Sequence, residues 1–531
     1  AVNPLVSRSP AAGQQEVGKP AFKTSLTKHD SLLLKVIISL TLLTSSYLGY
    51  VTFTRQHSLI FGFVASFLSL FAVKFLFSNL VLLFHRNSRN FIFNKGISTR
   101  VYRDIIQHKE HKSNTELTIM MPVYNEDFSI IRGTIDSSLK EIENYGLDKA
   151  NLVICDDGLM ILSDNKLDAF VKKAKALPPS ARNEEQREVL ARLDYYEELI
   201  GRSDLTFGVV ARPKPVKGIA ETERKGAFKK ASNLNYTFRL SDEITGLMKT
   251  QDISYNDALQ QILTSNNHYE LAFIKGKVFI SETHLLLDKD SLIPTGISRE
   301  AIPDFQENVS LAYIQCATAP SNRNENFFTR IVSYFTDQAF NIAFPLATLS
   351  GALVSLVGHN VYIRTSVLKQ HNYWSEDRVS EDLSLSLDLY AQGYYGKYLN
   401  IAGMAFGEIV SNNYMDEVGK HARYAYGAGE IFFNPIKHWF TQGLLSKQFR
   451  EFLKSPFLPW QVKVDITIYL AHYFNAIIML PVVLLAGFAQ IQHLSIIGPI
   501  IAFWGTGSFI SNLSYQYRGD KRDGPRKMLH N

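Results

Sequence analysis

Four long apolar runs near the two ends of the chain flank a more polar middle. The runs are residues 36–53, 58–84, 466–488 and 494–515. A helix needs ~20 mainly apolar residues to cross a bilayer, so the pattern predicts four transmembrane helices, with a buried helical hairpin as the alternative for the first pair. Basic residues beside the runs mark the cytosolic side of a span. Both termini and the middle are therefore expected in the cytosol, and Lys74, inside the second run, should face protein or water.

Between these runs, short apolar strands alternate with helical stretches. The strand-like segments are residues 117–122, 151–155, 205–210 and 284–287. Such alternation predicts a parallel α/β sheet. Acidic residues follow several of the strands, at the edge of an open sheet where ligands bind. Residues 163–203 and 239–270 carry many charges at helical spacing, which indicates solvated helical insertions without chemistry.

Composition narrows the picture only slightly. The net charge of +6 over 531 residues is mild, and much of the basic excess lies beside the apolar runs, which argues against a nucleic-acid surface. Cys155 and Cys316 are the two cysteines. They are far apart and supply neither a disulfide framework nor a zinc site, as suits a cytosolic domain. The first thirty residues show no cleavable signal peptide.

A carboxylate pair opens the leucine-rich stretch that ends at Gly393. Glu381 and Asp382 follow Ser380, which is a good helix N-cap. Acidic residues suit the positive end of a helix, and a rigid helix start would hold a general base in place. Acidic residues in a first turn are often merely solvated, so this pair alone is a weak signal.

Two further acidic pairs follow predicted strands. Asp156 and Asp157 end one strand, and Asp288 and Asp290 follow another. Mg²⁺ is commonly shared between one or two carboxylates and the phosphates of a substrate. Each pair alone is weak, because turns use aspartate freely.

Two basic segments could bind phosphate groups. Residues 224–235 are rich in lysine and asparagine, and residues 420–427 mix cations with aromatic rings. The alternatives are an amphipathic helix with a basic face for the first and a membrane-surface helix for the second. Aromatic and basic residues also alternate over residues 432–460, which is typical of helices in a membrane interface.

Six motifs in this order resemble the processive family-2 glycosyltransferases, which include cellulose, chitin and hyaluronan synthases. They are Pro-Val-Tyr-Asn-Glu at 122–126, Asp-Asp-Gly at 156–158, Lys-Ala-Ser-Asn-Leu-Asn at 230–235, Asp-x-Asp at 288–290, Gly-His-Asn at 358–360 and Ser-Glu-Asp at 380–382. Each motif is modest, but six in register over residues 117–430 are specific. The Gly-His-Asn and Arg-Tyr-x-Tyr-Gly versions are most similar to fungal family-2 enzymes linked to hyphal growth.

The resemblance implies a GT-A type α/β fold, a mixed sheet with flanking helices, and a role for each motif residue. Asp382 would be the base, with Glu381 beside it. The donor, a UDP-sugar, would contact Tyr124, Glu126, Asp156, Asp157, Lys229, Asn233, Asp288, Lys420 and Arg423. Mg²⁺ or Mn²⁺ would bind Asp288 and Asp290. The acceptor would meet Gly358, His359, Asn360 and Tyr424.

This sequence departs from the family pattern in one motif. The family has a Gln-x-x-Arg-Trp signature at this point. In this sequence Lys420 replaces the glutamine, Arg423 keeps the arginine and Tyr424 replaces the tryptophan. Lysine is still a phosphate partner, whereas tyrosine in place of tryptophan leaves processivity open. A second acidic pair, Glu376 and Asp377, competes with Glu381 and Asp382 for the role of base.

The resemblance and the apolar runs together predict six parts of the chain. They are a disordered cytosolic tail (1–30), two transmembrane helices (31–85), a cytosolic glycosyltransferase domain (112–400), a diphosphate and acceptor segment with interface helices (401–460), two transmembrane helices (461–517) and a basic cytosolic tail (518–531).

The expected protein is a multi-pass enzyme of the plasma membrane. It would transfer sugar with inversion from a nucleotide-sugar to a growing β-linked polysaccharide, which it could also export. Its partners would be the donor, the glycan acceptor, membrane lipid and a second copy of itself, and not nucleic acid. The alternatives are a non-processive transferase acting on a lipid-linked acceptor and a non-catalytic membrane scaffold. The scaffold predicts a lost acidic motif residue, and none is lost.

Overall fold

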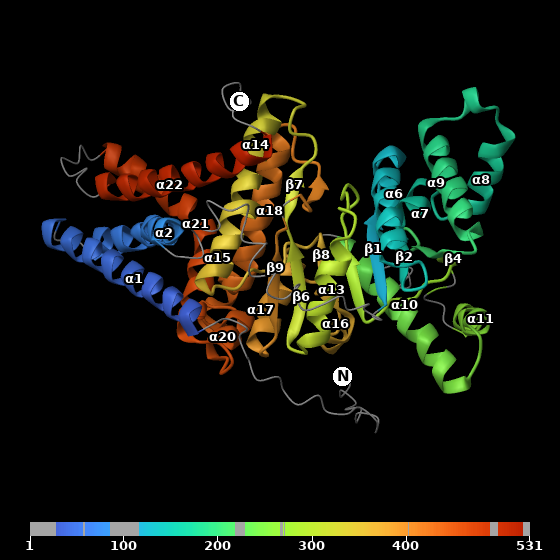
Figure 1. The fold of residues 1–531 in the computed structure, drawn as a ribbon, viewed down its shortest axis with the longest axis horizontal. Coiled ribbons are helices and arrows are strands. Elements are labelled where there is room, and N and C mark those ends of the chain that lie inside the picture. Colours follow the sequence, from blue (N-terminus) through green and yellow to red (C-terminus); the bar gives the residue numbers. More distant parts are fainter. Residues whose placement is uncertain are drawn as a thin grey trace.

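A computed structural model of the chain describes residues 28–56, 59–84, 116–217, 229–265, 269, 271–401, 403–488 and 497–523. Long helices from the two ends of the chain lie together at one end of the molecule, and an α/β body forms the rest (Figure 1). The long helices are α1 (Lys28–Gln56), α2 (Leu59–Phe84), α21 (Trp460–Phe488) and α22 (Ile497–Asp523). The expected tails fall mostly outside the described residues.

The body is built on a mixed sheet of eight strands in the described chain, in the order β4-β3-β2-β1-β5-β8-β6-β9. The strands are β1 (Leu117–Val123), β2 (Ala150–Asp156), β3 (Thr206–Ala211), β4 (Phe273–Gly276), β5 (Thr283–Leu286), β6 (Leu311–Cys316), β8 (Val361–Arg364) and β9 (Tyr395–Leu399). Strands β3, β2, β1 and β5 run parallel, whereas β4 and β8 are antiparallel to their neighbours. The expected mixed α/β sheet is thus confirmed.

Side chains of alternate residues in β1 enter two different cores. Ile119 and Met121 pack below helices α6 (Phe128–Tyr145), α9 (Glu184–Gly201) and α13 (Ile297–Glu307). Met120 belongs to the core on the other face, with α10 (Lys229–Gln251), α11 (Tyr255–Ser265), α17 (Glu381–Ala391) and α20 (Lys447–Lys454). Because strand side chains alternate between faces, the apolar run of β1 supplies both.

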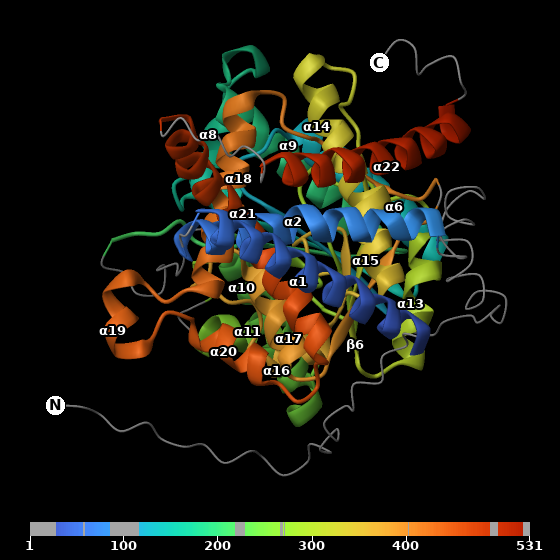
Figure 2. The same ribbon diagram turned by 90° about the vertical axis from the view of Figure 1, so that its left-hand side faces the viewer.

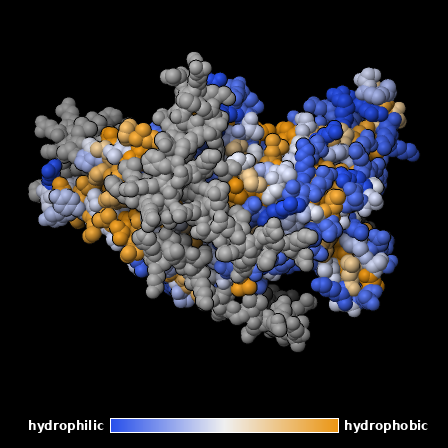
Figure 3. All heavy atoms as spheres, in the orientation of Figure 1, coloured by the Kyte–Doolittle hydropathy of each residue, from blue (hydrophilic) through white to orange (hydrophobic). Residues whose placement is uncertain are grey.

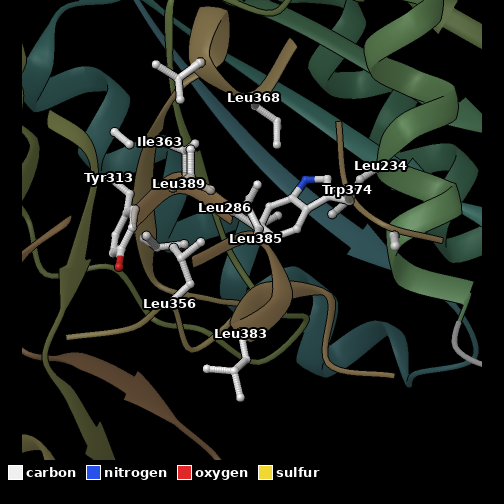
Figure 4. Close-up of a cluster of buried hydrophobic side chains, with 14 of the residues drawn as sticks. Leu234, Leu286, Tyr313, Leu356, Ile363, Leu368, Trp374, Leu383, Leu385 and Leu389 are labelled. Carbon is white, nitrogen blue, oxygen red and sulfur yellow. The ribbon is translucent and has the colours of Figure 1, made fainter. Parts of the chain in front are cut away.

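The second core continues from the sheet into the long helices. Leu34 of α1, Phe71 of α2 and Ile466 of α21 belong to the same buried cluster as Met120. Figure 4 shows the part of this core around α17, where Trp374 lies near Leu385. The long helices are therefore packed onto the α/β body and are not separate from it.

The expectation of four membrane spans is wrong within the described residues, where two helical stretches are long and apolar enough. These are Leu32–Arg55 and Phe61–Val81. The described start of α21 carries Lys463 and Asp465, and the described side chains of α22 include several glycines, serines and an asparagine. Side chains at 475–488 lie outside the description. Hydrophobic surface gathers over the long helices at the left of Figure 3.

Further helices lie between the long helices and the sheet. They are α14 (Phe327–Gln338), η3 (Ala339–Ala343), α15 (Phe344–Ser350) and α18 (Tyr414–Phe432), and Figure 2 shows α15 lying next to α1 and α2. Two short parallel strands, β7 (Thr318–Pro320) and β10 (Phe406–Glu408), form a separate small sheet. The predicted interface segment contains α19 (Trp439–Gln442), where Phe440 is fully exposed.

The insertion at residues 163–203 is not merely solvated, contrary to the sequence expectation. It forms α8 (Leu167–Ala176), the short η1 (Pro179–Ala181) and α9, after the single turn-and-a-half helix α7 (Asp157–Leu162). An Asn183–Gln186 capping box starts α9. One face of α9 buries Arg192 and Tyr196 almost completely. That face reaches the strand ends of the sheet.

Candidate active site

The two carboxylates predicted as the catalytic pair open helix α17. Glu381 and Asp382 occupy its first turn, and the Leu383 amide donates a 2.7 Å hydrogen bond to Asp382 Oδ1. The leucines that follow are buried and hold the helix on the second core (Figure 4). Gly393, with a φ of 89°, reverses the chain directly after the helix, as the sequence predicted. A fixed helix start therefore presents both carboxylates at its N-terminus.

Both carboxylates of the pair have a pKa above the ordinary value for their residue type. Burial and the neighbouring Asp382 raise the pKa of Glu381 to about 7, although Lys230 opposes the rise. Burial also raises the pKa of Asp382 above its ordinary value. Two like charges in adjacent positions titrate as a unit. A carboxylate with a pKa near neutrality is suited to general-base chemistry.

Gly358 brings backbone directly against the second carboxylate. Its φ is 83°, and a Cβ built on it would lie 2.9 Å from Asp382 Oδ2. Any side chain here would both strain the backbone and push the carboxylate away. The predicted acceptor residue Gly358 is therefore in contact with the predicted base.

Lys230 joins the separate parts of the site. Its ammonium group forms an ion pair with Asp288 and donates a 2.9 Å hydrogen bond to the Gly358 carbonyl. Sequence reasoning selected Lys229 from the same basic run and missed Lys230. The Lys229 side chain lies outside the described residues. Adjacent lysines in a helix point about 100° apart, and the sequence alone did not fix which of them faces the strand ends.

The two aspartates predicted to bind metal differ in their electrostatic state. Burial alone would raise the pKa of Asp288, but Lys230, His359 and Lys289 outweigh it and lower the pKa. Burial and the charge of Asp288 raise the pKa of Asp290, and its Oδ2 accepts a 3.2 Å hydrogen bond from the Ile409 amide. The two carboxylates thus share a pocket of negative charge.

Glu408 is a third carboxylate in this pocket, and sequence reasoning assigned it no role. It is the last residue of β10, and its Oε2 lies 3.7 Å from His359 Nδ1. Burial raises the pKa of Glu408, and the charges of Asp288 and Asp290 raise it further. His359 acts in the opposite direction and lowers this pKa. Its only sequence signal was its position after Gly407 in a connector. The fold alone brings it to the strand ends.

The residues present fit a divalent cation that also binds phosphate. No cluster of three or more histidine, cysteine, aspartate or glutamate side chains has the geometry of a metal cage among the described residues. Mg²⁺ needs only one or two carboxylates when phosphates complete its shell. Asp288 and Asp290 supply those carboxylates, and the raised pKa of Asp290 marks negative charge that a cation would neutralise.

The Asp156–Asp157 motif is held by arginines from other elements. Arg192 of α9 donates a 3.0 Å hydrogen bond to Asp156 Oδ1, and Tyr196 donates one of 2.9 Å to Oδ2. Arg212, which follows β3, binds Asp157 through Nη2 at 2.6 Å and Nε at 3.0 Å. Bidentate pairing of this kind fixes a carboxylate in orientation as well as charge. Sequence reasoning missed both arginines.

The loop after β1 is organised by the same arginine. Arg192 also donates to the Glu126 carbonyl. The Glu126 carboxylate accepts a 2.6 Å hydrogen bond from the Tyr124 amide and lies 3.3 Å from Lys289 Nζ. Asn233 of α10 donates from Nδ2 to the Cys155 carbonyl at 2.8 Å. The predicted donor residues of three elements therefore meet at the ends of β1 and β2.

Helix α18 brings the predicted diphosphate and acceptor residues toward the catalytic pair. A Cβ at Gly427 would lie 2.0 Å from Ser380 Oγ, so α18 packs directly on the start of α17. Ser380 makes no capping bond with its side chain, contrary to the N-cap expectation. Partial desolvation by its neighbours, followed by the charges of Glu408 and Asp382, raises the pKa of Tyr424. Lys420 lies on the same helix and acts electrostatically on Glu408.

Two of the predicted residues have structural partners. Asn360 is fully buried at a φ of 52°, and its amide donates a 3.1 Å hydrogen bond to Thr318 Oγ1. It shapes the turn that carries Gly358 and His359. In the competing acidic pair, Glu376 accepts a 2.8 Å hydrogen bond from Asn235, while Asp377 is exposed. The geometry therefore favours Asp382 over Asp377.

Comparison with known proteins gives one family match and two distant structural likenesses. Residues 285–490 match the family model for glycosyl transferase family group 2. A search of curated proteins finds no match. A mannosyltransferase from Pyrobaculum calidifontis, solved with GDP-Man and Mn²⁺, is 12% identical, with a TM-score of 0.35 over 84% of this chain and 98% of that one.

The second likeness is to residues 1–349 of TarS from S. aureus, at 12% identity and a TM-score of 0.31. It covers 77% of this chain and 92% of that one. Both likenesses are too distant to transfer a substrate or a metal to this chain. The family match covers Asp288, the Gly358 turn, the catalytic pair and α18.

Proposed function

This chain is a family-2 glycosyltransferase, and from that premise we propose that it is a membrane-embedded polysaccharide synthase that uses a UDP-sugar. The contact between Gly358 and Asp382, bridged through Lys230 to Asp288, carries the proposal. This set of contacts joins a base with a raised pKa to the carboxylates that would hold a cation, and the cation would bind the diphosphate. The order of the six motifs, which resembles that of the processive family-2 glycosyltransferases, supports the synthase assignment.

The proposed reaction is a direct displacement with inversion. Asp382 accepts the proton of the acceptor hydroxyl, and the hydroxyl oxygen forms a bond to the anomeric carbon of the donor. The bond from that carbon to the diphosphate breaks, and UDP leaves with the electron pair. Mg²⁺ or Mn²⁺, held by Asp288 and Asp290, would supply positive charge beside the diphosphate.

The remaining residues of the site position these groups. Lys420 and Arg423 of α18 would offset the charge that develops on the diphosphate. Tyr424, which is 39% exposed, would present its ring to the acceptor. Asp156 and Asp157, which are fully buried and paired with Arg192 and Arg212, would hold the donor loop in place.

A panel of UDP-sugars tests the proposal. The full chain, reconstituted in lipid with Mg²⁺ or Mn²⁺, is expected to release UDP with one donor and to form a polymer that a matching glycosidase degrades. UDP release without polymer, with one sugar on a lipid, would replace the synthase with a non-processive transferase. No release from folded protein with any donor would favour a non-catalytic scaffold.

A further inference from the structure

A cavity of about 690 Å³ lies between the long helices and the α/β body. Its walls come from α1, α2, α14, η3, α15, α21 and α22, and from the segment at residues 352–357. Pockets for drug-sized ligands typically have ~300–1,000 Å³ and are mostly apolar. The volume is therefore that of a ligand site and far exceeds a packing defect.

The segment at residues 352–357 lines the cavity and is hydrogen-bonded to the helix that begins with the catalytic pair. The Leu356 amide donates a 2.8 Å hydrogen bond to Ser386 Oγ of α17, and the Ser386 hydroxyl donates to the Asp382 carbonyl at 2.9 Å. The next residue but one, Gly358, touches the Asp382 carboxylate. One short stretch of chain thus links the cavity lining to the base.

The lining of the cavity is mostly hydrocarbon, with scattered hydroxyl and amide groups. Phe71, Ile342, Leu346 and Trp504 represent the apolar part, and Phe75 packs on Trp504 with ring centroids 4.9 Å apart. Serines, an asparagine, a glutamine, a histidine and tyrosine hydroxyls supply the polar part. Such a surface matches a hydrocarbon chain better than it matches a sugar polymer, which has hydroxyls on every residue.

Charge in the lining is balanced within the protein itself. Lys74 Nζ lies 2.6 Å from Asp465 Oδ1, and the two side chains are 21% and 10% exposed. No other lysine, arginine, aspartate or glutamate lines this cavity in the described part of the chain. An anionic headgroup would need an uncompensated cation, because a buried charge is costly without a partner. The cavity is therefore electrostatically suited to an uncharged headgroup.

We propose that the cavity binds an uncharged, hydroxyl-bearing lipid, and that this lipid is the molecule to which the first sugar is added. The proposal rests on the proposed transferase function. The hydrocarbon occupies the cavity, and the hydroxyl passes the edge of residues 352–357 to reach Asp382. Its oxygen forms the bond to the anomeric carbon, its proton goes to Asp382, and UDP leaves as the diphosphate.

Photolabelling without any donor tests lipid binding separately from transfer. The full chain in detergent micelles is exposed to a diazirine-bearing diacylglycerol, with or without an excess of unlabelled diacylglycerol or polyprenyl phosphate. Wild-type protein is expected to be labelled, with peptides of α2 or α15 carrying the label. Diacylglycerol should compete at least about tenfold better than polyprenyl phosphate.

Two cavity-filling variants and a matched control decide where the lipid sits. Ala347→Phe on α15 and Ser78→Phe on α2 place a ring in the cavity, and each should reduce labelling at least about tenfold. Ala502→Phe makes the same alanine change at an exposed position of α22 and should label like the wild type. Binding of UDP, measured in parallel by calorimetry, shows that each variant is folded.

Three results would overturn the proposal. Labelling that is unchanged in both filling variants would remove the lipid from the cavity, and preference for polyprenyl phosphate would remove the uncharged headgroup. A polymer shortened by Ala347→Phe with unchanged labelling would assign the cavity to the glycan. Wild-type protein that is labelled as expected but releases no UDP with any sugar would instead refute the proposed function, and with it the acceptor role of the lipid.

Discussion

At the scale of single residues, the surroundings of Asp382 raise the pKa of this proposed base. Glu381 adds a like charge, Gly358 presses backbone against the carboxylate, and Lys230 moderates the rise in pKa. None of these effects requires a special residue at position 382. The same aspartate in an exposed first helical turn would be an ordinary solvated acid.

Replacement of Asp382 tests the assignment of the base. Asp382→Asn should lower transfer by about 10²- to 10⁴-fold or abolish it, because an amide cannot accept the proton of the acceptor hydroxyl. UDP binding should be retained. Asp377→Asn is the matched control, since Asp377 is exposed and belongs to the competing pair. If Asp377→Asn instead removes transfer, the base is misassigned. Steady-state rates of UDP release and calorimetry with UDP provide the measurements.

The pH dependence of transfer reports the coupling within the pair. A base must be deprotonated, so the raised pKa of Asp382 means that activity is lost on acidification at a higher pH than an ordinary aspartate would give. Glu381→Gln removes the like charge, which should lower the pKa of Asp382 and move the acidic limb of the profile to lower pH. An acidic limb that stays in place or moves upward would contradict coupling. The measurement is kcat/KM against pH in constant ionic strength.

The choice between Lys230 and Lys229 can be made by paired substitutions. Lys230→Met removes the ion pair with Asp288 and the bond to the Gly358 carbonyl, so kcat/KM should fall at least about tenfold, or 1.4 kcal/mol. Because Lys230 lowers the pKa of Asp288, the variant should also need a higher pH to bind Mn²⁺. A larger loss in Lys229→Met would restore the expectation made from sequence.

At the scale of elements, helix α9 shows how an insertion can support a site that it does not enter. Its buried face carries Arg192 and Tyr196 to Asp156 and to the carbonyl of Glu126. Burial raises the pKa of Asp156 although Arg192 opposes the rise. The donor loop and the end of β2 therefore depend on one arginine from a helix at the edge of the sheet.

Removing that arginine should destabilise the protein more than it changes its chemistry. Arg192→Leu leaves Asp156 buried without its cation, a change that typically costs about 3–5 kcal/mol. Arg187→Leu, on the exposed face of the same helix, should change stability by less than about 0.5 kcal/mol. Thermal unfolding of both variants in detergent measures the difference. Equal unfolding temperatures would show that Asp156 is not held by Arg192.

At the scale of the whole molecule, the long helices and the catalytic body form one packed unit. Lys74 of α2 reaches Asp465 of α21, almost four hundred residues later in the chain. The apolar core of the sheet also continues into α1, α2 and α21. The packing of helices from both ends of the chain therefore forms the cavity that lies near the catalytic pair.

The Lys74–Asp465 ion pair can be tested by a double-mutant cycle. Asp465→Leu should cost about 3–5 kcal/mol, because Lys74 is left partly buried without a partner. Lys74→Met combined with Asp465→Leu should recover most of that loss, since two apolar side chains replace the pair. Unfolding temperatures in detergent give the coupling. A double variant as unstable as the two losses added would show that the side chains do not interact.

The sequence by itself determined the local features of this protein. Alternating and continuous apolar runs located β1, β2 and the start of α17, and Gly393 marked the turn that follows the helix. The acidic residues after strands identified one edge of the sheet. These features follow from strand and helix periodicity and from backbone freedom, which neighbouring residues alone decide.

Only the tertiary structure decided which polar groups meet. Lys230 rather than Lys229 contacts Asp288, Glu408 joins the acidic pocket, and Arg192 fixes Asp156. It also reduced four expected spans to two qualifying stretches within the described residues. The physical reason is that burial and ion pairing join residues that are 36, 58 or more positions apart. Nothing in the local pattern of the chain specifies such a partner.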